Sequence, residues 1–296
     1  MIESVNISKR FKNGKGIFGL NFSVKEGEVF GFIGPNGAGK STTIRHLMGF
    51  LRPDQGDMRI GKYNCWSESE KIKEKVGYLP GEIVFPTGLA AHEFLDLQGF
   101  LHRKQGKTQE KDLIDRFKLN INIPIKNMSK GMKQKLAIVS TFMCDPDIII
   151  LDEPSSGLDP LMQKELIDLL EEEKKKGKTI FLSSHIFEEI EVISDTICII
   201  KDGKIVKYQS LKDVFGELKK YIVVRLDETD TQHEGGPFLK IPYQKTKEGF
   251  YRIPLDGNVN EIIQYLSLHK VCDISIEQSR LRDVFEDYYR GDAEDV

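Results

Sequence analysis

The sequence reads Gly34-Pro35-Asn36-Gly37-Ala38-Gly39-Lys40-Ser41-Thr42 between an apolar run at 29–33 and a segment with helical spacing from 41 to about 49. A strand, the pattern G-x-x-x-x-G-K-[ST] and a helix, in this order, form a phosphate-binding loop. The glycines let consecutive backbone N–H groups turn inward around an anion, and the helix directs its positive end to the same point. The alternative is an ordinary glycine-rich turn, which would not need a strand before it and a helix after it. The sequence therefore predicts that the chain binds a nucleoside triphosphate.

Three side chains have a predicted role toward this nucleotide. Lys40 places a positive charge on the β- and γ-phosphates, and the hydroxyl of Ser41 is a ligand for Mg²⁺. Phe11 presents an aromatic face that can stack on adenine. Taken in isolation, Phe11 would be read as an ordinary core or surface phenylalanine, so its role depends on the other motifs.

The composition indicates a globular protein with a polar surface. The chain has 296 residues, of which 39% are hydrophobic and 30% are charged, and its formal net charge is −3. Because basic residues are not in excess, nucleic acid is not expected as the main partner. The start of the sequence lacks the pattern of a signal peptide, and no apolar run approaches the roughly 20 residues that span a bilayer. Any role at a membrane is therefore expected to depend on a partner.

The cysteines give no sign of a metal site or of a disulfide framework. There are four, Cys65, Cys144, Cys198 and Cys272, and none forms a C-x-x-C pair. We interpret them as reduced thiols of a cytoplasmic protein.

The order of apolar segments predicts an α/β domain at 1–210 and a second domain at 211–296. In the first, strand-like and helix-like segments alternate, which favours a mainly parallel sheet, and residues 1–24 have the pattern of an antiparallel hairpin. Residues from about 82 to 145 are mostly helical and indicate an α-helical insert. The second domain is expected to be a small α+β unit, with strands near 221–226, 238–242, 250–253 and 271–276 and helices near 260–269 and 280–289.

Asp152 and Glu153 follow the apolar run at 148–151, which has the pattern of a strand buried on both faces. A carboxylate at the end of such a strand is held rigidly, so Asp152 can fix Mg²⁺ beside the phosphates. Glu153 can then orient or deprotonate the attacking water. The alternative is an acidic turn with no such role, which the phosphate-binding loop upstream disfavours.

Ser129 precedes a helical segment that begins at Lys130. Its hydroxyl is suited to cap that helix, whose positive N-terminal end favours an anion. A plain capped helix would explain this pattern equally well if it stood alone.

These motifs, together with Ser156-Gly157-Leu158-Asp159 and Ser184-His185, resemble in order and content the nucleotide-binding subunits of ATP-binding-cassette (ABC) transporters. The resemblance covers residues 1 to about 210. It implies a P-loop NTPase fold of the ABC ATPase type, which has a RecA-like core, an antiparallel β subdomain and an α-helical subdomain. The C-terminal α+β domain would then be an accessory domain.

The resemblance also implies the roles of single residues. Lys40, Glu153 and His185 would be the catalytic residues, with Glu153 as the base and His185 in contact with the γ-phosphate. Ser129 and Gly131 would close on the γ-phosphate held by a second subunit. ATP and Mg²⁺ are the implied cofactors.

Two departures from the family pattern affect these expectations. Gly81 stands where a glutamine is usual, and glycine has no side chain to reach Mg²⁺ or water, although Glu82 follows directly. In the signature segment, Lys130 replaces the usual glycine and Met132 the usual glutamine. Such variants, and the C-terminal segment 276–285, are similar to drug- and peptide-exporter ATPases of the bacitracin-resistance type.

The resemblance implies a mechanism in which two chains enclose two ATP molecules head to tail and drive a transmembrane permease. Two other functions stay open from the sequence: a soluble ABC-type ATPase acting on ribosomes or DNA, and a slow nucleotide switch. The dimer is either a homodimer or a heterodimer. The C-terminal domain could bind a ligand or brace the dimer, and we favour the brace.

Overall fold

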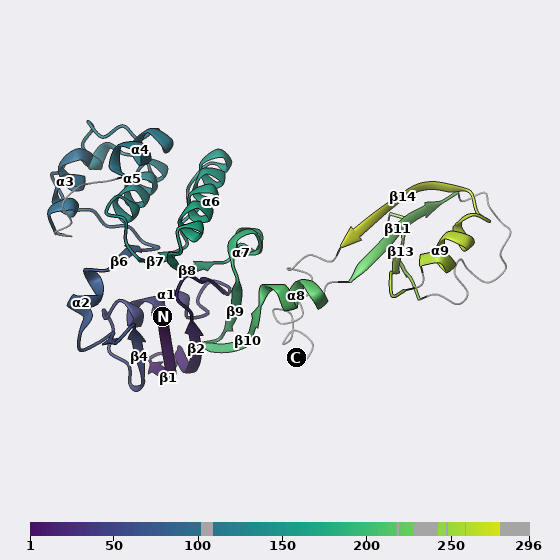
Figure 1. Cartoon of the computed structure of the whole chain (residues 1–296), viewed down its shortest axis with the longest axis horizontal. Coiled ribbons are helices and arrows are strands. Elements are labelled where there is room, and N and C mark those ends of the chain that lie inside the picture. The colour runs from purple at the N-terminus through teal and green to yellow at the C-terminus, as the bar shows by residue number, and fades with distance from the viewer. Residues whose placement is uncertain (102–108, 218, 228–241, 247, 258, 279–296) are drawn as a thin grey trace. The chain divides into compact units, whose positions relative to one another are not determined.

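The computed structural model describes residues 1–101, 109–217, 219–227, 242–246, 248–257 and 259–278 (Figure 1). The chain divides into two compact units, Met1–Leu211 and Lys212–Val296. Each unit has its own sheet and its own apolar core.

The first unit is built on a six-stranded mixed sheet with the order β10-β9-β3-β8-β7-β6. Neighbouring strands are parallel except β10, which runs antiparallel to β9. The central strands are apolar and buried along almost their whole length, as expected for parallel strands that are covered on both faces. This confirms the expected α/β class. The bounds of the six strands are β3 (Val29–Ile33), β6 (Val76–Leu79), β7 (Ile148–Asp152), β8 (Thr179–Ser184), β9 (Thr196–Lys201) and β10 (Lys204–Ser210).

A second, antiparallel sheet belongs to the same unit. The hairpin expected at 1–24 is present as β1 (Ile2–Arg10) and β2 (Gly16–Val24). A further strand, β4 (Gln55–Ile60), pairs with the other edge of β1 and is followed by the short β5 (Tyr63–Asn64). The sequence did not indicate this pairing, because it joins segments about fifty residues apart.

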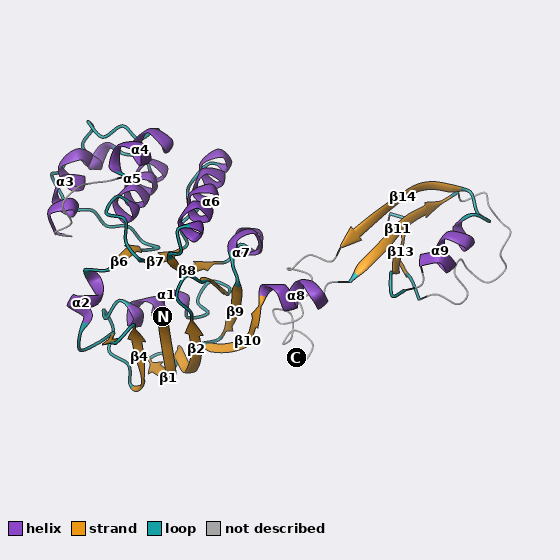
Figure 2. Cartoon of the chain, viewed as in Figure 1, coloured by secondary structure: helices purple, strands orange, loops and turns teal. Residues whose placement is uncertain are grey.

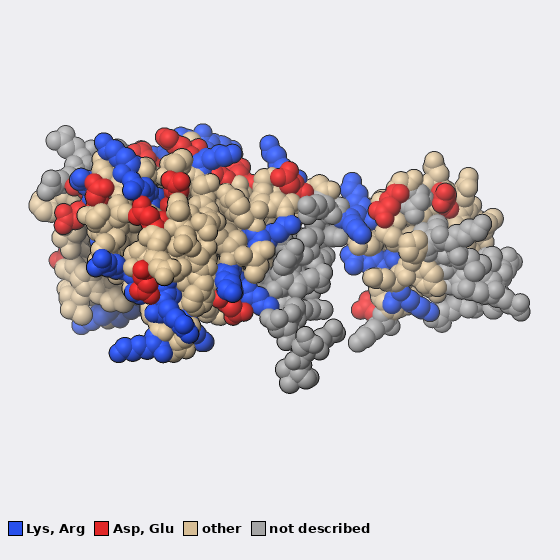
Figure 3. Space-filling model, turned by 90° about the horizontal axis from the view of Figure 1, so that it is seen from below, with Lys and Arg blue, Asp and Glu red and all other residues tan. Residues whose placement is uncertain are grey.

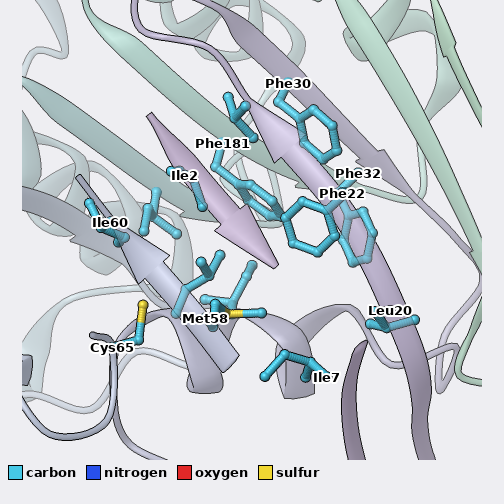
Figure 4. Packing of buried hydrophobic residues seen from close by; sticks show 14 of the residues in the cluster. Ile2, Ile7, Leu20, Phe22, Phe30, Phe32, Met58, Ile60, Cys65 and Phe181 are labelled. Carbon is cyan, nitrogen blue, oxygen red and sulfur yellow. The ribbon is translucent and has the colours of Figure 1, made fainter. Parts of the chain in front are cut away.

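Aromatic side chains fill the space between the two sheets (Figure 4). Phe22 comes from β2, Phe30 and Phe32 from β3, and Phe181 from β8. The ring centroids of Phe30 and Phe181 lie 5.3 Å apart, and those of Phe22 and Phe30 lie 5.5 Å apart. Such contacts bury large apolar areas. They fix the antiparallel sheet to β3, the strand that leads into the phosphate-binding loop.

The helical insert lies between β6 and β7 in the chain. Its helices group together, apart from the strands (Figure 2). The bounds are α3 (Ala91–Leu101), α4 (Glu110–Arg116), a 3₁₀ turn (Ile125–Asn127) and α5 (Lys130–Phe142). The remaining helices of the unit are α1 (Lys40–Leu47), α2 (Ser69–Lys73), α6 (Pro160–Lys175) and α7 (Phe187–Ile193).

The second unit is α+β. Its antiparallel sheet has the order β12-β13-β11-β14, and alternate residues of β11, Ile222 and Val224, pack with Ile262 and Leu266 of helix α9. Residues 238–241 of one expected strand, and the helix expected at 280–289, lie outside the described residues. The bounds are α8 (Leu211–Glu217), which begins at the boundary, β11 (Lys220–Leu226), β12 (Gln244–Lys245), β13 (Tyr251–Pro254), α9 (Val259–Leu266) and β14 (Val271–Gln278).

Charge is mixed on the surface of the first unit. On the face drawn in Figure 3, lysine and arginine side chains lie among aspartates and glutamates. None of the helices in the described ranges combines the length and the apolar composition needed to cross a membrane.

Candidate functional site

The phosphate-binding loop connects β3 to α1. Gly37 and Gly39 have φ angles of 84° and 113°, which side-chain-bearing residues rarely adopt. Gly34 is constrained by space instead, because a Cβ atom there would lie 2.5 Å from the carbonyl oxygen of Ile200. The glycines at these positions are therefore required by the shape of the loop.

Lys40 is the first residue of α1, and its side chain is buried inside the loop. Its Nζ donates a hydrogen bond to the carbonyl oxygen of Gly34 at 2.5 Å. The same Nζ lies 3.0 Å from Oε1 of Glu153 and forms an ion pair with it. The ammonium group is thus held at the centre of the loop, where a phosphate chain would require it.

Phe11 and the phosphate-binding loop line one cavity of about 320 Å³. Phe11 follows the last residue of β1 and is 38% exposed, so one face of its ring is free for stacking. Gly34 and Ala38 are buried beneath the loop and do not line this cavity. The predicted nucleotide-binding residues that do line it are Phe11, Pro35, Asn36, Gly37, Gly39, Lys40, Ser41 and Thr42.

Asp152 ends β7 and is only 3% exposed. Its Oδ1 accepts a hydrogen bond from the hydroxyl of Ser183 on β8 at 2.5 Å, which fixes the carboxylate. Asp152 and Ser41 line a second cavity, of about 530 Å³. Among the described residues, no cluster of three or more His, Cys, Asp or Glu side chains is arranged to hold a metal ion. A hydroxyl and one carboxylate nevertheless fit Mg²⁺, which takes oxygen ligands and is usually completed by phosphates and water.

Glu153 brings the predicted catalytic residues together. Its backbone has a φ of 51°, an uncommon conformation for a residue other than glycine, and its N–H donates to the carbonyl oxygen of Ser183 at 3.0 Å. Its Oε2 lies 2.5 Å from Nδ1 of His185, whose side chain is half exposed. Because Lys40 pairs with the other carboxylate oxygen, the Glu153 carboxylate lies between Lys40 and His185.

Ser129 and Gly131 do not line either cavity. Ser129 is exposed and caps α5, because its Oγ accepts a hydrogen bond from the N–H of Met132 at 3.2 Å. A Cβ atom on Gly131 would lie 2.9 Å from the carbonyl oxygen of Gly157. Gly131 therefore lies beside Gly157, and neither Ser129 nor Gly131 shares a cavity with the phosphate-binding loop of its own chain.

Gly81 lies against the carboxylate of Asp152, the predicted Mg²⁺ ligand. A Cβ atom there would lie 3.2 Å from Oδ2 of Asp152, so any side chain would press on that group. Both Gly81 and Glu82 line the larger cavity, and Glu82 is exposed.

The site contains further polar residues that the sequence motifs did not identify. Arg45 lies one turn after Ser41 on α1 and lines the larger cavity. Glu189 of α7 accepts a hydrogen bond from Ser184 Oγ at 2.8 Å, and burial raises the pKa of its carboxyl group. Glu189 carried no motif signal in the sequence, because it lies in α7 (Phe187–Ile193) after the segment that carries His185.

Known proteins share both the sequence and the fold. A sequence model of the family described as "ABC transporter" matches residues 17–156. The chain is 32% identical to the bacitracin transport ATP-binding protein BcrA of Bacillus licheniformis, over 96% of each chain. It is 32% identical to the linearmycin resistance ATP-binding protein LnrL of Bacillus subtilis, over 76% of this chain and 74% of that protein.

A solved structure of a dimeric ATP-binding cassette, in a post-hydrolysis state bound to ADP and Pi, superposes with a TM-score of 0.64 and 25% identity. The match covers 71% of this chain and 99% of that one. The phosphate-binding loop, the buried carboxylate of Asp152 and the paired Glu153 and His185 all lie within a fold of this type. This agreement of site, sequence and fold shows that the chain belongs to the ATP-binding subunits of ABC transporters and is an ATPase.

Proposed function

We propose that this ATPase powers a membrane exporter of drugs or antimicrobial peptides from the cytoplasmic face of the membrane. The observation that carries the proposal is the Glu153 carboxylate, held 3.0 Å from Lys40 and 2.5 Å from His185 beside the phosphate-binding loop. The direction and the cargo class are supported by the similarity to the bacitracin and linearmycin proteins.

In this proposal the nucleotide lies across both cavities. Phe11 stacks on adenine, and the N–H groups of the loop and Lys40 bind the phosphates. Ser41 and Asp152 hold Mg²⁺, which when bound neutralises charge on the β- and γ-phosphates. Asp152 keeps its orientation through its hydrogen bond to Ser183.

Glu153 acts as the base. Its carboxylate orients the attacking water and accepts its proton at one of the two oxygens. His185 keeps that carboxylate turned toward the phosphates and contacts the γ-phosphate through its exposed face. Lys40 stabilises the negative charge that develops during transfer.

Ser129 and Gly131 complete the site of a second subunit. They lie outside both cavities of their own chain, while the helix end that Ser129 caps favours an anion. ATP would thus join two chains head to tail, and hydrolysis would remove the γ-phosphate that joins them.

The permease would bind beside the helical insert. Exposed apolar side chains lie there in the segment 81–101: Val84, Leu97, Phe100 and Leu101. Apolar patches on a surface mark sites of association. Motion of the insert during ATP binding would pass to the permease through this contact.

Glu153→Gln tests the catalytic role. The amide keeps the shape of the side chain but cannot accept the proton, so the variant should bind ATP, stay dimeric with ATP and release almost no phosphate. Phosphate release and size-exclusion chromatography with ATP measure this. Glu188→Gln, a change at an exposed carboxylate, is the control and should behave as the wild type. Normal phosphate release by Glu153→Gln would refute the role of Glu153.

The exporter assignment is tested by isolating the tagged chain from detergent-solubilised native membranes. A multi-span membrane protein that copurifies with it is the expected result. Ribosomal proteins or nucleic acid without a membrane subunit would overturn the exporter proposal. A chain that copurifies with the permease but hydrolyses ATP far below transporter rates would instead be a nucleotide switch, as Gly81 in place of a glutamine would allow.

A further inference from the structure

Glu189 connects two loops of the site through buried serines. Its Oε2 accepts a hydrogen bond from Ser184 Oγ at 2.8 Å, and Ser155 is a second hydrogen-bond partner of the same carboxylate. Ser184 is 0% exposed and Ser155 is 5% exposed. Ser184 directly precedes His185, and Ser155 follows Glu153 by two residues. One carboxylate on α7 is therefore bonded to both loops that carry the predicted catalytic pair.

Folding stability does not explain a carboxylate at this place. Burial, first, and then the nearby charge of Glu153 raise the pKa of Glu189, while its two serine partners and His185 act in the opposite direction. A raised pKa means that the ionised form is less favourable in the folded chain than in the unfolded chain. The destabilisation grows as the pH rises through the range in which Glu189 ionises.

The two segments that Glu189 connects have backbone conformations that must be held in place by neighbouring groups. Glu153 has its uncommon φ of 51°, and conformations of this kind persist only where the surroundings hold them. On the other side, Ser184 Oγ accepts a hydrogen bond from the N–H of Ile186 at 3.0 Å, which fixes the turn around His185. The 2.5 Å contact between Glu153 and His185 lies between these two turns.

We propose that Glu189 is a positioning residue that holds the Glu153 loop and the His185 loop in the one arrangement from which ATP is hydrolysed. This rests on the proposed roles of Glu153 and His185. Because Ser155 directly precedes the segment 156–159, which lies beside Gly131, Glu189 also connects the catalytic pair to the region that faces a second subunit.

The test compares Glu189→Ala, Glu189→Gln and Glu188→Gln. Glu188 lies on the same helix but is exposed, so its variant is the matched control. Glu189→Ala removes the carboxylate and should lower kcat for ATP hydrolysis by about 10- to 100-fold, with KM for ATP unchanged. A fall of this size is expected when catalytic groups are slightly misplaced. Glu189→Gln keeps an acceptor oxygen and should recover part of that loss. Its thermal midpoint should equal or exceed that of the wild type, because the buried charge is gone.

Two results would overturn the proposal. One is a wild-type kcat in Glu189→Ala. The other is a parallel fall of kcat, ATP affinity and thermal midpoint in Glu189→Gln, which would show a merely structural role. Glu153→Gln separates this proposal from the proposed function: if Glu153→Gln is inactive while Glu189→Ala is fully active, the positioning role fails and the ATPase mechanism stands. If Glu153→Gln hydrolyses ATP normally, the mechanism itself fails.

Discussion

Glu153 combines a strained backbone with a side chain whose charge is balanced on two sides. Lys40 is buried and pairs with one carboxylate oxygen, and His185 contacts the other. An amide at 153 preserves the shape but leaves the Lys40 ammonium without its carboxylate partner. Substitutions here should therefore change turnover far more than the fold.

The residues themselves were predictable from the sequence, but their contacts were not. The motifs named Lys40, Glu153 and His185, because each carries chemistry at a recognisable place in the order of the chain. They could not show that Glu153 contacts both of the others, since that depends on where α1 begins and where β7 and β8 end in space. Glu189 was missed for a related reason: its partners are plain serines that no motif marks.

The cysteines allow a prediction at this scale. Burial raises the pKa of Cys65 to about 12 and also raises that of Cys198, so neither forms the reactive thiolate at ordinary pH. Cys144 is buried as well, whereas Cys272 on β14 is exposed. In the native protein at about pH 8, close to the usual thiol pKa, a colorimetric thiol reagent should modify one cysteine rapidly.

Cys272→Ser should remove this rapid phase and leave the slow reaction of the others, which accelerates only on unfolding. A rapid phase that persists in Cys272→Ser would show that a thiol described as buried is accessible in solution.

At the scale of elements, β3 and α7 are packed without spare room. A Cβ atom on Gly31 of β3 would lie 2.4 Å from Cγ2 of Ile190 and 2.7 Å from Oγ of Ser194. Gly31→Ala should therefore lower the free energy of unfolding by about 1–3 kcal/mol, the usual effect of overpacking a core. Urea unfolding measures it.

Gly216→Ala is the control, because no atom lies within 4 Å of the added Cβ and its φ is not positive. Equal stability of Gly31→Ala and the wild type would mean that α7 moves away from β3 at little cost.

The sequence predicted which segments are strands more readily than it predicted which strands pair with one another. Apolar runs such as 148–151 and 179–182 predicted β7 and β8, because strands buried on both faces have that pattern. The position of β4 beside β1 had no signal in either strand alone. Likewise, no local pattern explained the glycine at position 31, which is accounted for by the close approach of α7.

At the scale of the whole molecule, the two units have separate cores. One apolar cluster draws its residues from Ile2 to Ile205, and the cluster of the second unit begins at Ile222. A chain ending at residue 217 should therefore fold, unfold in one transition and bind ATP with the affinity of the full chain. Calorimetry and nucleotide titration measure these.

If the second unit braces the dimer, as we favour, the shortened chain should need more protein to dimerise with ATP. Aggregation or loss of ATP binding would show that the second unit is part of the nucleotide-binding fold. Unchanged dimerisation would favour the other function considered for the second unit, which is to bind a ligand.

Ser129 caps a helix that lines neither nucleotide cavity of its own chain. On its proposed role, a single copy carries two half-sites and hydrolyses little ATP alone. The rate of ATP consumption then depends on encounters between copies. It rises more steeply than in direct proportion to the concentration of the chain. A cell that makes scattered, unassembled copies would lose little energy to them, and activity would be confined to places where copies are concentrated. Dividing the site in this way makes assembly itself the safeguard against wasteful hydrolysis.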